Sequence, residues 1–230
     1  DGAGIDYAAA LTEDDGPTSI VDTDLIVTAG GGGGGPASVA VFDNGLYVDT
    51  AGGYGSESDT IQASLASSGH SVSTFTATDA TGIGAALAGK NVLVIPEQER
   101  GAIAPALSAA AKTEITDFVA NGGGLIISAD YNGFLNGVFG FSISTLTSSG
   151  TASINNVNAA GTPFAGGPAS LPPHSYTGEY VTSTLPAGSS TIYSDGAGST
   201  VAIIPYGSGE IVSLGWDWYN AQPIGSQDGG

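Results

Sequence analysis

Short apolar runs alternate with stretches of helical periodicity from Ala37 onward. Apolar runs that are typical of buried strands occur at Ser38–Phe42, Asn91–Pro96 and Gly124–Ser128, and Ser71–Thr76 alternates between apolar and polar residues. Apolar residues at helical spacing predict helices over Ser58–Gly69, Asp79–Ala88 and Pro105–Asn121. Strands that alternate with helices predict an α/β fold, with a mostly parallel sheet flanked by helices on both faces.

The C-terminal third is richer in strand patterns. Strands are predicted over Ser189–Tyr193, Val201–Pro205 and Glu210–Gly215, and the Tyr206–Gly209 turn joins the last two. This β-hairpin is expected to complete the sheet. The long polar stretch 148–186 is expected to be a surface insertion within one domain that spans residues 37–230.

Residues 1–36 differ from this domain and are predicted to form an N-terminal β arm on a hinge. Ser19–Thr28 reads as a strand, and the six glycines Gly30–Gly35 and Pro36 follow it. Such a strand can pair with its own sheet or with the edge of a neighbouring copy, so we expect self-association. The apolar residues that would carry this assembly are Ile20, Val21, Leu25, Ile26 and Val27.

Composition limits the classes of partner. The 230 residues include 22 acidic and 3 basic ones, for a net charge of −19, and there is no Cys. Nucleic acid is excluded as a partner, because phosphate binding needs clustered Lys and Arg, and no apolar run is long enough for membrane insertion. The composition favours a secreted, extracellular protein that binds Ca²⁺ through carboxylate oxygens.

Two groups of residues are candidate calcium ligands. The stretch Asp1–Asp6 has the G-x-G-x-D spacing of the calcium-binding nonapeptide repeats and resembles one imperfect copy of them, although Gly and Asp are abundant in this chain and a plain turn is the favoured interpretation. The second group consists of carboxylates that follow predicted parallel strands, where ligands bind in such sheets. With Asp6, the candidate metal ligands are Asp43, Glu97, Glu99, Asp130 and Asp217. The alternative is that these side chains cap helices or loops, or face solvent, with Arg100 paired to one of them.

Aromatic residues near the C-terminus offer a candidate ligand-binding surface. Trp216 and Trp218 share one face of a strand, because they are two residues apart. With Tyr219 they are candidates for stacking against a sugar, so glycans are a possible partner class. The alternative is that these rings cover the end of the sheet.

The order and spacing of five stretches resemble the class I glutamine amidotransferase-like (flavodoxin-like) fold, in a divergent secreted branch. The stretches are VAVFDNG, GHSVSTF with the helix before it, LAGKNVLVIPEQE, ITDFVANGGGLIISADY and YGSGEIVSLGWDWYNA. The resemblance implies a catalytic Cys after Gly124–Ile127, where this chain has Ser128, and a later His that it lacks. Ser128, Asp130 and Glu97 remain as candidate catalytic residues.

These observations lead to one expected function and two alternatives. We expect a non-catalytic structural or interaction domain of an extracellular surface or matrix protein, which assembles into filaments or arrays through the N-terminal strand and calcium. The first alternative is a carbohydrate-active or amide hydrolase that uses the carboxylates. The second is a carbohydrate-binding module that uses the aromatic residues.

Overall fold

The computed structural model describes residues 36–53, 55–130, 132–148, 150–171, 177–196, 198–215 and 218–226. The predicted arm, Asp6, His174, Trp216 and Asp217 lie outside these residues. The helices are α1 (Glu57–Ser67), α2 (Ala80–Leu87), α3 (Ala109–Ala120), α4 (Phe134–Phe139) and α5 (Asn156–Ala159), with 3₁₀ turns at Ala104–Ala106 and Thr182–Thr184. The strands are β1 (Ser38–Phe42), β2 (Ser71–Phe75), β3 (Val92–Ile95), β4 (Gly124–Ser128), β5 (Thr145–Ser148), β6 (Ala152–Ile154), β7 (Ser170–Leu171), β8 (Thr177–Tyr180), β9 (Ser190–Ser194), β10 (Ser199–Tyr206) and β11 (Gly209–Leu214).

The strands form one 11-stranded mixed sheet with the order β2-β1-β3-β4-β11-β10-β9-β6-β7, and β8 and β5 branch from β10. The pairs among β2, β1, β3, β4 and β11 are parallel. All other pairs are antiparallel, including the predicted hairpin of β10 and β11. The α/β class and the hairpin are therefore confirmed, but the expectation of a mostly parallel sheet is wrong.

The extra antiparallel strands come from the polar stretch that was expected to be an insertion. It contains β6, α5, β7 and β8, and β6 and β8 hydrogen-bond to β9 and β10. These strands are two to four residues long. Such short segments carry too few residues for an alternating pattern to stand out from the surrounding polar residues.

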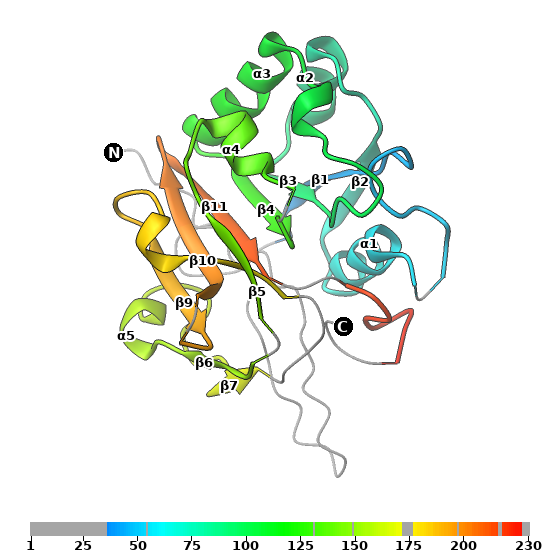
Figure 1. Ribbon diagram of the computed structural model, residues 1–230. Helices are drawn as coiled ribbons and strands as arrows, with labels where there is room; N and C mark the ends of the chain where they lie inside the picture. The colour runs from blue at the N-terminus through cyan, green and yellow to red at the C-terminus, as the bar shows by residue number, and fades with distance from the viewer. Residues whose placement is uncertain are drawn as a thin grey trace.

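Two apolar cores lie on opposite faces of the sheet. Ile61 and Leu65 of α1 belong to one core, while α2 and α3 contribute Ile83 and Ile115 to the other. Figure 1 shows α2, α3 and α4 on one side of the parallel strands and α1 apart from them, near the carboxyl ends of these strands. Helices on both faces fix the parallel strands rigidly, which positions the loops that follow them.

Helix starts follow local capping chemistry. The side chains of Ser56, Asp79 and Ser108 accept hydrogen bonds from the first turns of α1, α2 and α3. α3 thus begins after Ser108, because the predicted Pro105 lies in a separate 3₁₀ turn. No helix of the described residues is long and apolar enough to cross a membrane.

Candidate metal centre

The loop between β1 and α1 is held in a defined shape by its own polar groups. Asn44 accepts a hydrogen bond from the Leu46 amide at 3.0 Å, and its side-chain amide donates to the carbonyl of Thr76 at 2.7 Å. Further along the loop, the side chain of Val48 is completely buried. These contacts present Asp49 beside the start of α1.

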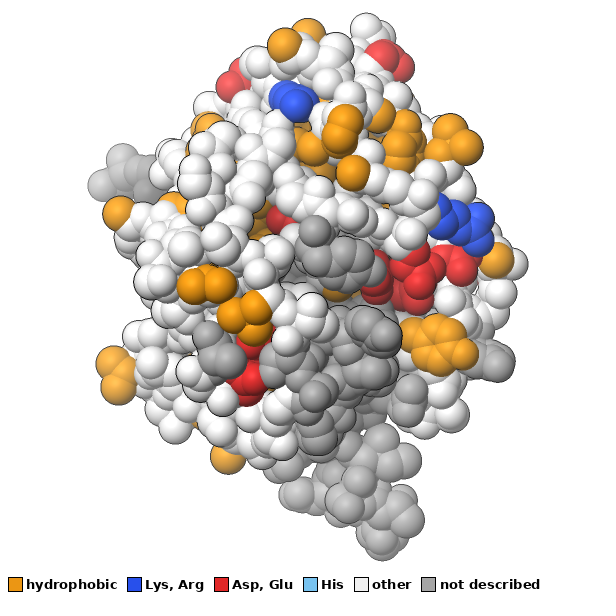
Figure 2. Space-filling model, viewed as in Figure 1, with side chains coloured by type: hydrophobic (Ala, Val, Ile, Leu, Met, Phe, Trp, Pro, Cys, Tyr) orange, Lys and Arg blue, Asp and Glu red, His pale blue; other side chains and the backbone are white. Residues whose placement is uncertain are grey.

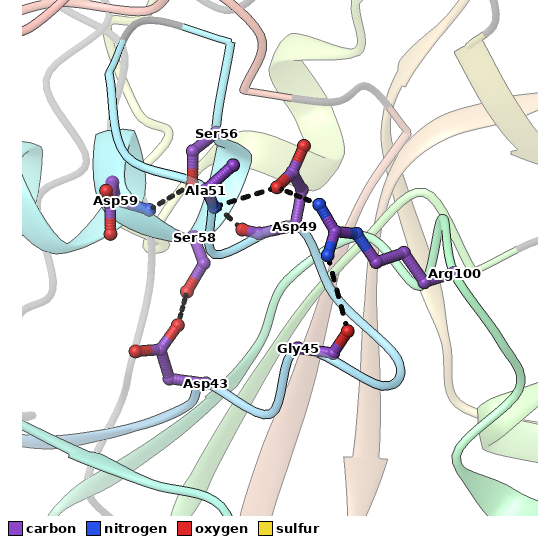
Figure 3. Close-up of polar contacts among 8 residues, drawn as sticks. All are labelled: Asp43, Gly45, Asp49, Ala51, Ser56, Ser58, Asp59 and Arg100. Atoms are coloured by element: carbon purple, nitrogen blue, oxygen red, sulfur yellow. Dashed lines mark hydrogen bonds and ion pairs between the residues drawn. The ribbon is translucent and has the colours of Figure 1, made fainter.

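Asp49 forms hydrogen bonds within this loop and with Arg100, which follows β3 (Figure 3). Its Oδ1 accepts hydrogen bonds from the Ala51 amide at 2.9 Å and from Nη2 of Arg100 at 2.7 Å. Its carbonyl accepts from the hydroxyl of Ser56, the N-cap of α1, at 2.8 Å. The ion pair with Arg100 is partly exposed to solvent, which screens it, so it contributes about 1 kcal/mol or less to stability.

Three carboxylates converge at this point. Oxygen atoms of Asp49, Glu57 and Glu99 all lie within 4.8 Å of one another. Oxygen ligands that share one Ca²⁺ at about 2.4 Å are at most about 4.8 Å apart, so this set fits a single divalent cation. Figure 2 shows a patch of acidic side chains beside a basic one on this face of the molecule.

The three ligands differ in exposure. Glu57, the first residue of α1, is 2% exposed, Asp49 is half-buried and Glu99 faces solvent. A buried carboxylate beside two others is costly unless positive charge balances it. Arg100 and the positive end of the helix dipole of α1 supply part of that charge, and a cation would supply the rest.

Neighbouring carboxylates extend the negative potential. The Ser58 hydroxyl donates to Asp43 at 2.7 Å, and Asp59 lies in the same first turn of α1. The pKa of Asp59 is raised by partial burial and by the charges of Asp43 and Asp49. Repulsion between these carboxylates favours a cation at the site.

The topology explains why this location can hold a ligand. From β1 the chain passes to β2 on one side, and it returns to β3 on the other side of β1. The loops that leave β1 and β3 therefore diverge and leave room at their carboxyl ends. Asp49 follows β1 and Glu99 follows β3, so the carboxylates flank this switch point.

Asp130 lies elsewhere on the same edge and has a structural role. Its carboxylate accepts hydrogen bonds from the amides of Phe134 and Leu135 at 2.6 and 3.1 Å, and from the hydroxyl of Tyr180 at 3.0 Å. It thereby caps α4 and links β4 to β8. Burial raises the pKa of Asp130 to about 6, although these hydrogen bonds oppose the shift.

The other candidate catalytic residues are also buried. Ser128 is fully buried and Glu97 is 5% exposed. Ala129, which follows Ser128, has a φ of +43°, a strained backbone conformation. The residue at this strained position is therefore an alanine, whose methyl side chain cannot act as a nucleophile. His70 accepts a hydrogen bond from the amide of Ala37, at the amino end of β1, which is the opposite edge of the sheet from Ser128.

The sequence identified one of the three clustered carboxylates. Glu99 was predicted, whereas Asp49 and Glu57 were not, because only residues directly after strands were considered. Asp43, Glu97 and Asp130 are not members of the three-residue group. The signal that was available for Glu57 is its position directly after the N-cap Ser56, where acidic residues favour the helix dipole.

The described aromatic residues have different environments. Trp218 is 3% exposed and belongs to the core under α1, and its carbonyl accepts a hydrogen bond from Thr60 at 2.7 Å. Tyr219 is 46% exposed. Its Cε2 lies 3.3 Å from the position that a Cβ on Gly55 would occupy, so the ring lies against the loop that leads to Glu57.

Comparisons with known proteins show the fold alone. No family model matches the sequence, and no curated protein matches it. Among solved structures, the chain is similar to the N-terminal domain of mmIFT52, with 12% identity, coverage of 78% of this chain and 86% of that one, and a TM-score of 0.53. The cytoplasmic protein STM1381 from Salmonella typhimurium LT2 has 14% identity, coverage of 82% and 90%, and a TM-score of 0.52.

A third similar structure is the cytoplasmic protein STM3548 from Salmonella typhimurium, with 12% identity, coverage of 81% and 91%, and a TM-score of 0.52. These structures overturn the assignment to a secreted, Cys-lacking branch of the class I glutamine amidotransferases. None of the three is described as an amidotransferase or as secreted. What the comparisons support is the α/β architecture.

Proposed function

We propose that this chain is a calcium-binding, non-catalytic domain of an extracellular surface or matrix protein. The observation that carries the proposal is the group of Asp49, Glu57 and Glu99 at the switch point between β1 and β3. Carboxylates that come from two loops and a helix start suit Ca²⁺, which tolerates irregular geometry with six to eight oxygen ligands. Water would complete the coordination at the exposed side, next to Glu99.

A structural role for the metal is favoured over a catalytic one. The polar residues at the end of β4 are inaccessible to a substrate in this structure, because Asp130 is buried and caps α4 and Ser128 is fully buried. A cation between Asp49, Glu57 and Glu99 would join the loop after β1, the start of α1 and the loop after β3. Binding would therefore stabilise the folded state.

Thermal unfolding tests the proposal. At a calcium concentration ten to a hundred times the Kd, linkage gives about 1.4–2.7 kcal/mol of stabilisation. For a domain of this size, that corresponds to a rise in Tm of roughly 3–10 °C over the value in chelator. Glu57→Gln should remove this rise, and Asp117→Asn on the exposed face of α3 is the matched control. Equal shifts in both variants would refute the site.

Calcium-dependent carbohydrate binding is the second candidate. The exposed ring of Tyr219 lies against Gly55, two residues before Glu57. A cation that coordinates sugar hydroxyls beside an aromatic face is a suitable arrangement for a glycan. A glycan array probed with and without calcium tests this candidate. If Tyr219→Ala gives the same glycan signals as the parent chain, the candidate is ruled out.

Self-association through the N-terminal strand stays a prediction. Light scattering of the full chain over a range of concentrations, with calcium and with chelator, measures it directly. Polymers that dissolve in chelator would connect assembly to the metal. A monomer in both conditions would remove assembly from the proposed function and leave calcium binding standing.

A further inference from the structure

β2 forms one end of the sheet and has a free edge in the described part of the chain. It pairs with β1 through five consecutive residue pairs in parallel register. The strand order begins with β2, so within the described residues no other strand pairs with its outer side. An edge of this kind presents main-chain donors and acceptors to an incoming strand.

The hydrogen bonds to β1 define which groups point outward. The amide of Ser71 donates to the carbonyl of Ala37 at 2.9 Å, and the carbonyl of Phe75 accepts from the amide of Asp43 at 2.8 Å. Both residues thus face β1. Because this direction alternates along a strand, the amides and carbonyls of Val72 and Thr74 point away from β1.

β2 lacks the features that usually protect an edge strand. Its sequence, Ser-Val-Ser-Thr-Phe, has no charged residue and no proline, and its register with β1 contains no bulge. Natural proteins block exposed edges with such residues and bulges, or they cover the edge with another segment. The uncharged edge is notable in a chain with a net charge of −19.

The chain itself supplies a suitable segment. Ser19–Thr28 is rich in β-branched residues, and alternate positions Val21, Thr23, Leu25 and Val27 place mostly apolar side chains on one face. Eight residues, 29–36, connect it to Ala37. They span up to roughly 26 Å when extended, whereas the position next to β2 is two strand spacings, about 10 Å, from β1.

The point where the chain enters β1 is also favourable. Ala37 lies beside the start of β2, because its amide donates to Nδ1 of His70 at 3.1 Å. Attachment through eight residues would give the segment an effective concentration in the millimolar range, which favours the segment of the same chain over that of a neighbour. Thr28 is the residue of this segment nearest to Ala37 in the sequence, so it would reach the start of β2 first and the segment would run antiparallel to β2.

We propose that Ser19–Thr28 adds to the outer edge of β2 in the same chain and hydrogen-bonds to Val72 and Thr74. The sheet thereby gains a further strand. This pairing within one chain is the alternative to the predicted self-association through the same segment, because a segment bound to its own β2 is not available to a neighbouring copy. This inference is independent of the calcium site. Its test is therefore run on the full chain in chelator, so the result does not depend on whether the chain binds calcium.

Amide hydrogen exchange followed by NMR tests the pairing residue by residue. In the full chain, the amides of Val72 and Thr74 should exchange on the order of 100-fold more slowly than unprotected amides. Leu25→Pro, which disrupts the added strand, should remove this protection. The amides of Ser73 and Phe75, which face β1, should stay protected in both proteins and report that the domain is folded.

Thr74→Pro is the second variant. It removes an outward donor and leaves the ladder to β1 intact, because the Thr74 amide faces away from β1. The amide of Val72 should then exchange at least about 10-fold faster. Fast exchange of Val72 and Thr74 in the parent chain would overturn the proposal. Protection that appears only as oligomers form at higher protein concentration would also overturn it, in favour of a strand from a neighbouring copy.

Discussion

Asp130→Asn should change how stability depends on pH. Burial raises the pKa of Asp130 from 3.8 to about 6, against the effect of its hydrogen bonds with Leu135, Phe134 and Tyr180. The folded state therefore binds a proton more tightly than the unfolded state does. The contribution of Asp130 to the free energy of unfolding is fully present below pH 3.8 and is lost as the pH rises through about 6.

The magnitude follows from the shift in pKa. A rise of about two units corresponds to about 3 kcal/mol, because each unit equals about 1.4 kcal/mol. Asn cannot titrate, so the variant lacks this component. The unfolded carboxyl is itself partly protonated at pH 4, so the stability of the parent minus that of Asp130→Asn should fall by about 2–2.5 kcal/mol between pH 4 and pH 7. Taking the difference cancels the titration of the other carboxylates.

Urea unfolding followed by tryptophan fluorescence measures this difference at pH 4, 5, 6 and 7, in chelator. Asp117→Asn, at an exposed position on α3, shows how much pH dependence an exposed carboxylate contributes. A difference between the parent and Asp130→Asn that stays constant across this range would refute the reasoning. It would mean that Asp130 is equally solvated in the folded and unfolded states.

Two further substitutions have defined expectations. Arg100→Gln removes the positive charge 2.7 Å from Asp49, so calcium should bind several-fold more tightly. The free energy of unfolding in chelator should fall by about 1 kcal/mol or less. Weaker calcium binding by Arg100→Gln in a titration would contradict this expectation. Thr60→Val removes the buried 2.7 Å hydrogen bond to the carbonyl of Trp218 and should lower the free energy of unfolding by about 1–3 kcal/mol. Thr113→Val, at an exposed hydroxyl on α3, is its control, and equal losses in urea unfolding would show that the link to Trp218 contributes nothing.

The parallel half of the sheet was predictable because its strands are continuous apolar runs. The predicted strands Ser38–Phe42 and Gly124–Ser128 match β1 and β4 residue for residue. The antiparallel half was predictable only in part. β9, β10 and β11 were predicted from their strand patterns, whereas strands such as β7, Ser170–Leu171, are too short to show a period. β8 and β6 pair with β10 and β9, which are distant from them in the sequence, and β7 joins the sheet through β6.

The candidate site was predictable in location but only partly in its residues. The carboxyl ends of β1 and β3 follow from the strand pattern, and Glu99 follows from them. Asp49 reaches the site through the path of its loop, which is held by Asn44 and Val48. Glu57 reaches it through the orientation of α1. Tertiary packing determines both of these placements, and the local sequence does not encode them.

Calorimetric titration of the full chain with calcium is the most direct test of the central claim. The account predicts saturable binding of one ion with a Kd at or below about 1 mM, in the range of extracellular calcium sites. Glu57→Gln should weaken this binding at least about tenfold, which corresponds to about 1.4 kcal/mol, while Asp117→Asn should leave it unchanged. Absence of binding in the parent, or equal binding in Glu57→Gln, would contradict the assignment of Asp49, Glu57 and Glu99 as a calcium site.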